Sequence, residues 1–112
     1  MGEKGEALGS LYLVDQGFQI GERNVRTRFG EIDLIARKNG EIYFVEIKTR
    51  TSIGHGHPLE SLPPYRVERL RRMAEWYLQR KKEGDRPAHL SLLGIDLSRE
   101  PVRFDFIADI ID

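Results

Sequence analysis

The sequence predicts an α/β domain, with helices packed against a mixed β-sheet in the order helix, three strands, helix, two strands. Three observations lead to this fold class. Residues 30–50 contain two runs rich in β-branched and aromatic side chains that flank Asn39-Gly40, which predicts a central hairpin. Residues 64–82 carry apolar side chains at helical spacing, and residues 102–111 alternate between apolar and polar. At 112 residues the chain is expected to form one domain over residues 1–112.

The composition narrows the function classes. The chain has no cysteine, which excludes disulfides, thiolate chemistry and zinc–thiolate sites. No apolar run approaches the length of a membrane span, and the first residues lack the profile of a signal peptide. We therefore expect a cytoplasmic protein that has no membrane partner.

Charge is distributed unevenly along the chain. The formal net charge is zero, which by itself argues against a nucleic-acid-binding protein. Residues 23–50 and 51–84, however, each carry seven Lys or Arg against four Asp or Glu. Residues 1–22 carry one against four, and residues 85–112 carry three against six. Because local charge determines where a polyanion binds, the basic middle of the chain is the expected binding region.

The N-terminal third predicts a helix followed by a strand. Residues from Glu6 to about Gln16 fit a short amphipathic helix, and Gly17 is placed to end it. The expected apolar side of this helix consists of Leu8, Leu11, Tyr12 and Val14. Residues from Phe18 to about Arg23 then fit a first strand.

The central hairpin gives a specific register. If Asn39 and Gly40 are the two central turn residues, the expected pairs are Lys38–Glu41, Leu34–Val45, Asp33–Glu46, Ile32–Ile47 and Glu31–Lys48. Side chains alternate between the faces of a strand. One face would therefore hold Ile32, Leu34, Ala36, Tyr43, Val45 and Ile47, and the other would hold Glu31, Asp33, Ile35, Phe44, Glu46 and Lys48.

The second of these faces predicts chemistry. Carboxylates that lie opposite each other in a sheet repel, and a hard divalent cation would relieve the repulsion. Lys48 follows Glu46 by two residues and brings an ammonium group to the same end of the hairpin. This combination is typical of metal-dependent hydrolysis of phosphodiesters.

The rest of the chain predicts a loop, a helix and two strands. Residues 51–63 fit a loop; its His55 and His57 lack the third convergent ligand that zinc needs, and a pH-sensitive phosphate contact is the alternative. Residues from Pro64 to about Lys82 fit a helix whose apolar stripe is Val67, Leu70, Met73, Ala74, Tyr77 and Leu78. His89–Asp96 and Val102–Ile111 fit two closing strands.

The spacing of Asp33 and Glu46-Ile47-Lys48 resembles the core of the PD-(D/E)xK nuclease superfamily. The longer strings GEIDLIA and FVEIKTR resemble the YraN family of small bacterial proteins, which is similar to archaeal Holliday-junction resolvases. The resemblance covers most of the chain, from Gly5-Glu6 to about Tyr77-Leu78. It implies a restriction-endonuclease-like core.

The resemblance also implies an activity, a Mg²⁺-dependent endonuclease acting on DNA, with branched DNA as one substrate class and a homodimer as one assembly. Mn²⁺ is expected to substitute for Mg²⁺. The implied metal ligands are Asp33, Glu46 and the Ile47 backbone carbonyl, with Lys48 as the catalytic cation. Glu6 is implied as an auxiliary acid, although a helix N-terminal acid favoured by the helix dipole is the alternative.

The expected phosphate contacts come from basic and hydroxyl side chains near this site, namely Arg26, Arg28, Thr49, Arg50 and Arg66. For Arg26 and Arg28 the alternative is a solvated strand edge. For Arg66 the alternative role is to handle a proton or a water molecule at the metal. Two other functions remain open for the whole chain, a non-catalytic nucleic-acid-binding protein and an interaction protein with surface ion pairs such as Glu31–Lys48.

Overall fold

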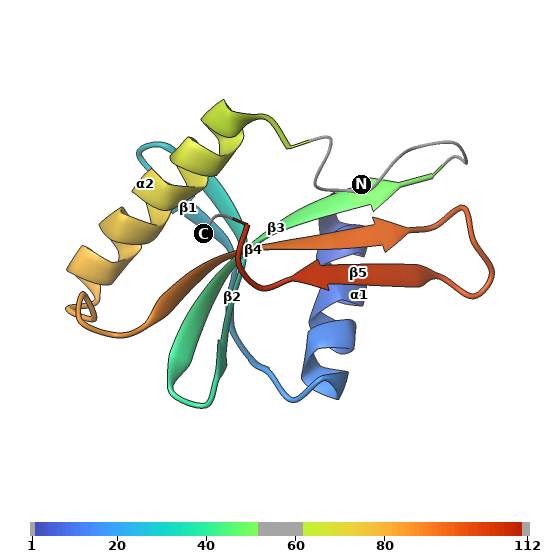
Figure 1. The fold of residues 1–112 in the computed structure, drawn as a ribbon, viewed down its shortest axis with the longest axis horizontal. Helices are drawn as coiled ribbons and strands as arrows, with labels where there is room; N and C mark the ends of the chain where they lie inside the picture. The colour runs from blue at the N-terminus through green and yellow to red at the C-terminus, as the bar shows by residue number, and fades with distance from the viewer. Residues whose placement is uncertain (1, 52–61, 111–112) are drawn as a thin grey trace.

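Five strands form one mixed sheet with a helix on each face (Figure 1). The computed structural model describes residues 2–51 and 62–110. The elements are α1 (Gly2–Asp15), β1 (Gln19–Thr27), β2 (Gly30–Lys38), β3 (Glu41–Arg50), α2 (Pro64–Arg80), β4 (Ala88–Asp96) and β5 (Arg103–Ile107). The strands lie in the order β1-β2-β3-β4-β5; β3 and β4 are parallel and the other neighbours are antiparallel. The predicted fold class and order of elements are confirmed.

The β2–β3 hairpin turns where the sequence predicts. Asn39 and Gly40 have φ angles of 54° and 79°, which is the left-handed region that a tight hairpin turn requires. The register runs from Lys38 opposite Glu41 to Leu34 opposite Val45, as expected.

Beyond Leu34 the predicted register is wrong. The β2–β3 ladder ends at the Leu34–Val45 pair, so Asp33–Glu46, Ile32–Ile47 and Glu31–Lys48 do not form as ladder pairs. From this point β2 continues beside β1, while β3 continues beside β4. The backbone N–H of Ile47 is donated to Oδ2 of Asp33 at 2.8 Å. The Asp33 carboxylate thus accepts a hydrogen bond from the backbone of β3 at the point where β2 and β3 separate.

The separation of the strands also changes which side chains share a face. Leu34, Ala36 and Val45 belong to the cluster that packs under α1, together with Leu13 of that helix. Ile32 belongs instead to the cluster under α2, with Ile35 and Phe44. The expectation that Ile32 and Leu34 share a face is therefore wrong, because strict alternation fails where β2 leaves β3.

Helix α1 packs on the sheet through its glycines and Leu13. A Cβ on Gly9 would lie 3.0 Å from a side-chain atom of Leu93, and Leu13 is completely buried. Leu11 and Val14 are 69% and 55% exposed, so the predicted apolar side of this helix is wrong in these two positions. The helix starts earlier than predicted, at Gly2, and ends before Gly17, whose φ of 96° fits the predicted stop.

The strand β1 is longer than predicted and forms a second hairpin with β2. It extends past Arg23 to Thr27, and Thr27 pairs with Gly30 across the two-residue turn Arg28-Phe29. The Thr27 hydroxyl accepts a hydrogen bond from the Phe29 N–H at 3.0 Å and donates one to the Gly30 carbonyl at 2.8 Å.

The C-terminal half follows the prediction closely. Helix α2 begins at Pro64 as expected, ends two residues before Lys82, and buries Leu70, Met73, Ala74 and Tyr77. The last strand is shorter than expected, covering 103–107 instead of 102–111. His55 and His57 lie outside the described residues. Neither helix found in residues 2–51 and 62–110 is long and apolar enough to cross a membrane.

Candidate active site

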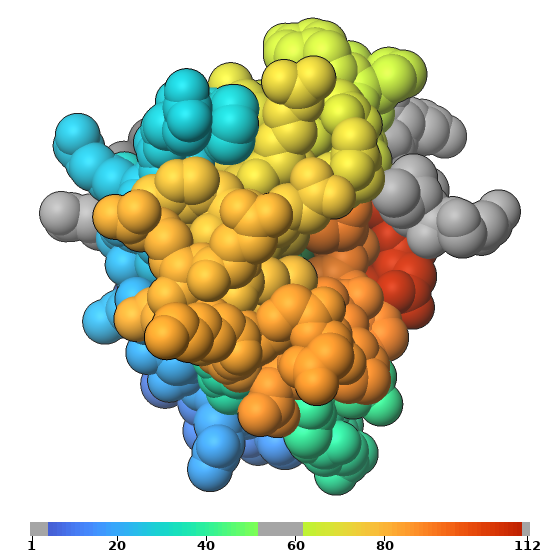
Figure 2. Space-filling view, turned by 90° about the vertical axis from the view of Figure 1, so that its left-hand side faces the viewer, coloured from blue at the N-terminus to red at the C-terminus, as the bar shows by residue number. Residues whose placement is uncertain are grey.

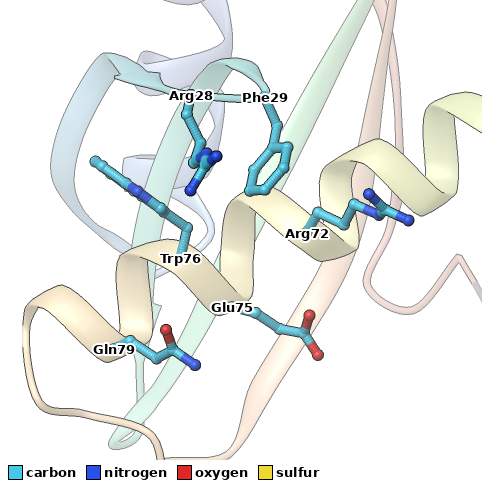
Figure 3. Close-up of a pocket in the computed structure, with 6 residues that line it drawn as sticks. All are labelled: Arg28, Phe29, Arg72, Glu75, Trp76 and Gln79. Carbon is cyan, nitrogen blue, oxygen red and sulfur yellow. The ribbon is translucent and has the colours of Figure 1, made fainter.

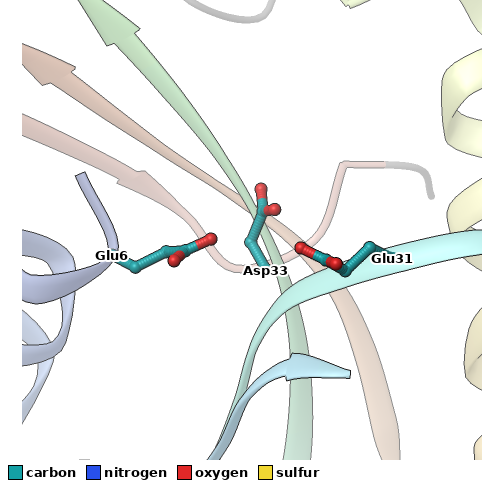
Figure 4. A group of neighbouring side chains, drawn as sticks. All are labelled: Glu6, Glu31 and Asp33. Carbon is teal, nitrogen blue, oxygen red and sulfur yellow. The ribbon is translucent and has the colours of Figure 1, made fainter. Parts of the chain in front are cut away.

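Three carboxylates from two elements meet at one end of the sheet. Ligand atoms of Glu6, Glu31 and Asp33 all lie within 4.8 Å of one another. Figure 4 shows Asp33 between Glu6, which comes from α1, and Glu31, which comes from β2. Two of the three were predicted as site residues, Asp33 as a metal ligand and Glu6 as an auxiliary acid.

The close approach of α1 to the sheet brings Glu6 into this group. A Cβ on Gly5 would lie 2.7 Å from Oγ1 of Thr49 and 3.5 Å from Cγ2 of Ile47. Any larger residue would therefore push the first turns of α1 away from β3. As a result Glu6 is only 6% exposed, which places it at the sheet surface rather than in the solvent.

Burial and neighbouring charges make Asp33 the electrostatic centre of the site. Loss of hydration raises the pKa of Asp33 to about 7, and the charges of Glu46, Glu6 and Glu31 add to the rise. The hydrogen bond from the Ile47 N–H acts in the opposite direction. Near neutral pH this carboxyl group is thus close to half protonated, and a bound cation would compete with its proton.

Glu46, the second predicted metal ligand, makes an ion pair with Arg66. The Glu46 side chain is 9% exposed and the Arg66 side chain is 32% exposed. The guanidinium comes from the first turn of α2 and provides the positive charge that the sequence predicts a metal would supply. Arg66 is thus directed at a carboxylate of the site, which differs from the phosphate contact predicted for it.

The other predicted residues of β3 follow Glu46 along the strand. Ile47, Lys48, Thr49 and Arg50 all lie in the parallel ladder with β4, opposite residues 93–96. Alternation along the strand places the side chain of Lys48 on the same face as that of Glu46. Thr49 lies against α1 at Gly5, so its hydroxyl contributes to helix packing.

The two predicted arginines of the β1–β2 hairpin are both exposed, and Arg26 contacts the acidic group. Nε of Arg26 lies 3.7 Å from Oε2 of Glu31, with the Arg26 side chain 90% exposed. The guanidinium carbon of Arg28 lies 5.5 Å from the centre of the Phe29 ring. Glu31 therefore has a described partner in Arg26, where we had considered Lys48.

The donor set fits a small divalent cation. Mg²⁺ prefers oxygen ligands at about 2.0–2.1 Å, so two oxygens on opposite sides of the ion lie about 4.2 Å apart. Among three ligands of an octahedral ion at most one pair lies on opposite sides, and the other pairs lie about 2.9 Å apart, so the three carboxylates would have to move closer together on binding from their separations of up to 4.8 Å. Glu6, Glu31 and Asp33 are the described residues that could hold such an ion, and Glu46 is available if Arg66 releases it.

Sequence reasoning missed Glu31 as a possible ligand. It was predicted to share a face of β2 with Asp33, two residues away, but was considered only for a surface ion pair. The alternation signal alone could have identified it, because i and i+2 side chains of one strand point the same way.

Comparison with known proteins identifies relatives over nearly the whole chain. The sequence profile described as "Uncharacterised protein family UPF0102" matches residues 5–108. A "UPF0102 protein" of Syntrophus aciditrophicus is 37% identical over 108 residues, covering 96% of this chain and 85% of the relative. One from Persephonella marina is 37% identical over 107 residues, with 96% and 80% coverage. Another, from Shewanella woodyi, is 42% identical over 98 residues, with 88% and 83% coverage.

Proposed function

The chain belongs to the uncharacterised protein family UPF0102, and we propose that it is a Mg²⁺-dependent endonuclease that hydrolyses phosphodiester bonds in DNA. The observation that carries this proposal is the convergence of Glu6, Glu31 and Asp33 at one end of the sheet. The raised pKa of Asp33 adds support, because perturbed groups of this kind concentrate at functional sites. Mn²⁺ is expected to replace Mg²⁺.

Each residue of the site has a distinct role in this proposal. Asp33, Glu6 and Glu31 would hold the ion, and the Ile47 carbonyl stays a predicted ligand. Glu46 would join them once Arg66 releases it. Bound Mg²⁺ supplies Lewis-acid stabilisation of the phosphate and makes a water molecule more acidic. The ammonium group of Lys48 would oppose the negative charge that develops on the phosphate in the transition state.

DNA is the proposed substrate because of the charge around the site. The exposed Arg26 lies beside Glu31 of the acidic group, and the exposed Arg28 lies on the same β1–β2 hairpin. Both suit phosphate contacts that do not depend on base sequence. Arg50 and Thr49 stay predicted phosphate contacts of β3. A homodimer would present two such surfaces to a branched DNA, which is the assembly we attach to a resolvase-like activity.

A cleavage assay tests this proposal. The protein is incubated with Mg²⁺ or Mn²⁺ and labelled linear, flapped and four-way DNAs of matched length. We expect metal-dependent cleavage of at least one substrate and its loss in Asp33→Asn. Cleavage that is unchanged in Asp33→Asn, or absent from every substrate while both metals bind, overturns the nuclease proposal.

The rival function is a nucleic-acid-binding protein without catalysis. The ion pair between Arg66 and Glu46 favours it, because an internal cation already balances one of the predicted ligands. Calorimetric titration with Mn²⁺ separates the two functions. Binding that Asp33→Asn abolishes supports the metal site, and the absence of binding by the parent protein supports the rival.

A further inference from the structure

A surface groove lies between the β1–β2 turn and the outer side of α2. Its volume is about 340 Å³, and it is lined by Arg28, Phe29, Arg72, Glu75, Trp76 and Gln79. Figure 2 shows the turn resting against α2 on this face of the molecule, and Figure 3 shows the lining side chains. None of these residues belongs to the acidic group of the candidate active site.

Guanidinium groups lie over the two aromatic rings that line the groove. The guanidinium carbons of Arg28 and Arg72 lie 5.5 and 6.0 Å from the centre of the Phe29 ring. That of Arg80 lies 4.6 Å from the centre of the Trp76 ring. In Figure 3 the Arg28 guanidinium lies between the Trp76 and Phe29 rings. The groove therefore combines aromatic rings with positive charge in one small volume, and an arginine side chain at its surface would have to turn aside for a ligand to stack on a ring.

Two further polar side chains, Gln79 and Glu75, line the groove. Gln79 offers an amide that both donates and accepts hydrogen bonds. Glu75 is the one acid of the lining, and its Oε2 lies 3.0 Å from Nη1 of Arg71, which offsets its charge. An anionic ligand with a flat ring is thus a better match than an acidic peptide, which would leave the aromatic faces unused.

We propose that this groove binds an unpaired nucleotide of a nucleic-acid strand. Its base would stack on Trp76 or Phe29, and its phosphates would contact Arg28 and Arg72. Stacking on aromatic side chains next to arginines is how proteins hold single-stranded nucleic acid without reading its sequence. A paired base has both faces covered by its neighbours in the duplex, so the same groove would bind a duplex interior weakly.

The groove is linked to the candidate active site through the start of β2. The turn residue Phe29 precedes Asp33 by four positions, which is about 13 Å along a strand. One strand of duplex DNA advances about 3.4 Å per nucleotide, so this distance spans about four nucleotide steps. An unpaired base in the groove would then lie about four nucleotides from the phosphate to be cut, as at a flap or a branch. This link rests on the proposed nuclease function, whereas the binding itself does not.

The sequence contains a single tryptophan, which makes the groove directly observable. Trp76 fluorescence is titrated with a single-stranded thymidine oligonucleotide and with a duplex of the same length, in EDTA so that cleavage cannot occur. We expect saturable quenching by the single strand and at least tenfold weaker binding of the duplex. Equal quenching by both, or no quenching although a labelled oligonucleotide binds, overturns the proposal.

Two arginine variants test the contacts without disturbing the core. Trp76 packs against the core cluster, so Trp76→Ala confuses binding with folding. Arg28→Ala and Arg72→Ala change exposed side chains and should each weaken single-strand binding by about tenfold. Arg103→Ala, on β5 at the other edge of the sheet, removes the same charge and should stay within twofold of the parent. An equal loss of single-strand affinity in all three variants would indicate general electrostatic attraction and would overturn the proposal that the groove is the binding site.

The outcomes for the groove and for the nuclease are separable. Quenching with no cleavage of any DNA overturns the nuclease and leaves the groove intact. Cleavage with no quenching overturns the groove alone. If a protein or peptide ligand of this face is found to quench Trp76 while single strands do not, the assignment to nucleic acid is wrong.

Discussion

The guanidinium of Arg66, in the first turn of α2, is ion-paired with the carboxylate of Glu46 on β3. This pair joins the helix layer to the strand that carries Lys48, beside the carboxyl group of Asp33. Removing the arginine would leave the buried negative charge of Glu46 without its partner and beside the carboxyl group of Asp33, which costs about 1–3 kcal/mol or more.

We therefore expect Arg66→Met to lower the melting temperature of the metal-free protein and to enlarge the stabilisation given by Mn²⁺. The physical reason is that a cation then takes the place of the guanidinium at Glu46. Thermal unfolding with EDTA and with Mn²⁺ measures both effects. Arg72→Met, an exposed position on the same helix, is the control and should change neither by much. If Mn²⁺ stabilises Arg66→Met no more than the parent, the ion does not reach Glu46.

Asp33 should make stability depend on pH. Its pKa is about 7 in the folded protein against 3.8 when unperturbed, so between these values the folded protein keeps a proton that the unfolded chain has lost. The free energy of unfolding should thus fall as pH rises from 4 to 8, by at most about 4 kcal/mol before solvent screening. Denaturant unfolding in EDTA at several pH values measures this slope. Asp33→Asn should flatten it, and an equal slope in the variant would contradict the raised pKa.

Lys48→Met should lower the cleavage rate while leaving DNA affinity nearly unchanged. An ammonium that opposes charge developing in the transition state is worth about 100-fold or more in rate. Single-turnover rates and binding measured in EDTA separate the two effects. Lys82→Met, on the exposed residue after α2, serves as a control for loss of one positive charge. Equal rates for Lys48→Met and the parent would remove Lys48 from the mechanism.

Gly5→Ala should move Glu6 away from the site. The added Cβ would meet Oγ1 of Thr49 at 2.7 Å, so α1 must shift, at a cost of about 1–3 kcal/mol despite the better helix propensity of alanine. We expect lower thermal stability together with weaker Mn²⁺ binding. Gly84→Ala is a matched control, because nothing lies within 4 Å of its Cβ position. A fully stable Gly5→Ala protein would mean that α1 packs more loosely than described.

His89 adds a second, independent pH effect. Its ring stacks on Tyr43 and lies 2.5 Å from Oε1 of Glu41 and 2.7 Å from Oδ1 of Asp109. Burial acts to lower the pKa of His89, but the two carboxylates outweigh it and the pKa is raised. Its stabilising contribution is complete below pH 6.5 and is lost as pH rises through the raised value.

In an Asp33→Asn background, which removes the overlapping titration, His89→Gln should therefore reduce the loss of melting temperature between pH 6 and 9. Compared with Asp33→Asn alone, the double variant should have a clearly lower melting temperature at pH 6 and a smaller deficit at pH 9. A difference that is constant across this range would show that His89 contributes packing alone.

Local signals accounted for most of the fold. Asn39-Gly40 set the turn of one hairpin, and the periodic stripe with Pro64 at its start set α2, because these depend on neighbouring residues. The Arg28-Phe29 turn was missed, since neither residue favours a positive φ and its hydrogen bonds come from Thr27.

The candidate site was predictable in part. Asp33 and Glu6 were named from the sequence and lie together with Glu31. The place where β2 leaves β3 could not be predicted, because it depends on each strand pairing with a different neighbour in the sheet. The Arg66–Glu46 pair was missed for the same reason, since it depends on how α2 crosses the sheet.

The two outer strands of the sheet bear on how copies of this chain could associate. An unpaired strand edge invites a second chain to add to it, which leads to sheet-extended dimers or to aggregation. Along β1, the register shifts between Ile20 and Glu22 and Asn24 has a φ of 54°, which interrupts a flat edge. On the far side β5 is only five residues long and follows Pro101. Both borders thus resist strand addition, so a dimer of this protein would form through its helices or its turns and not by joining two sheets into one.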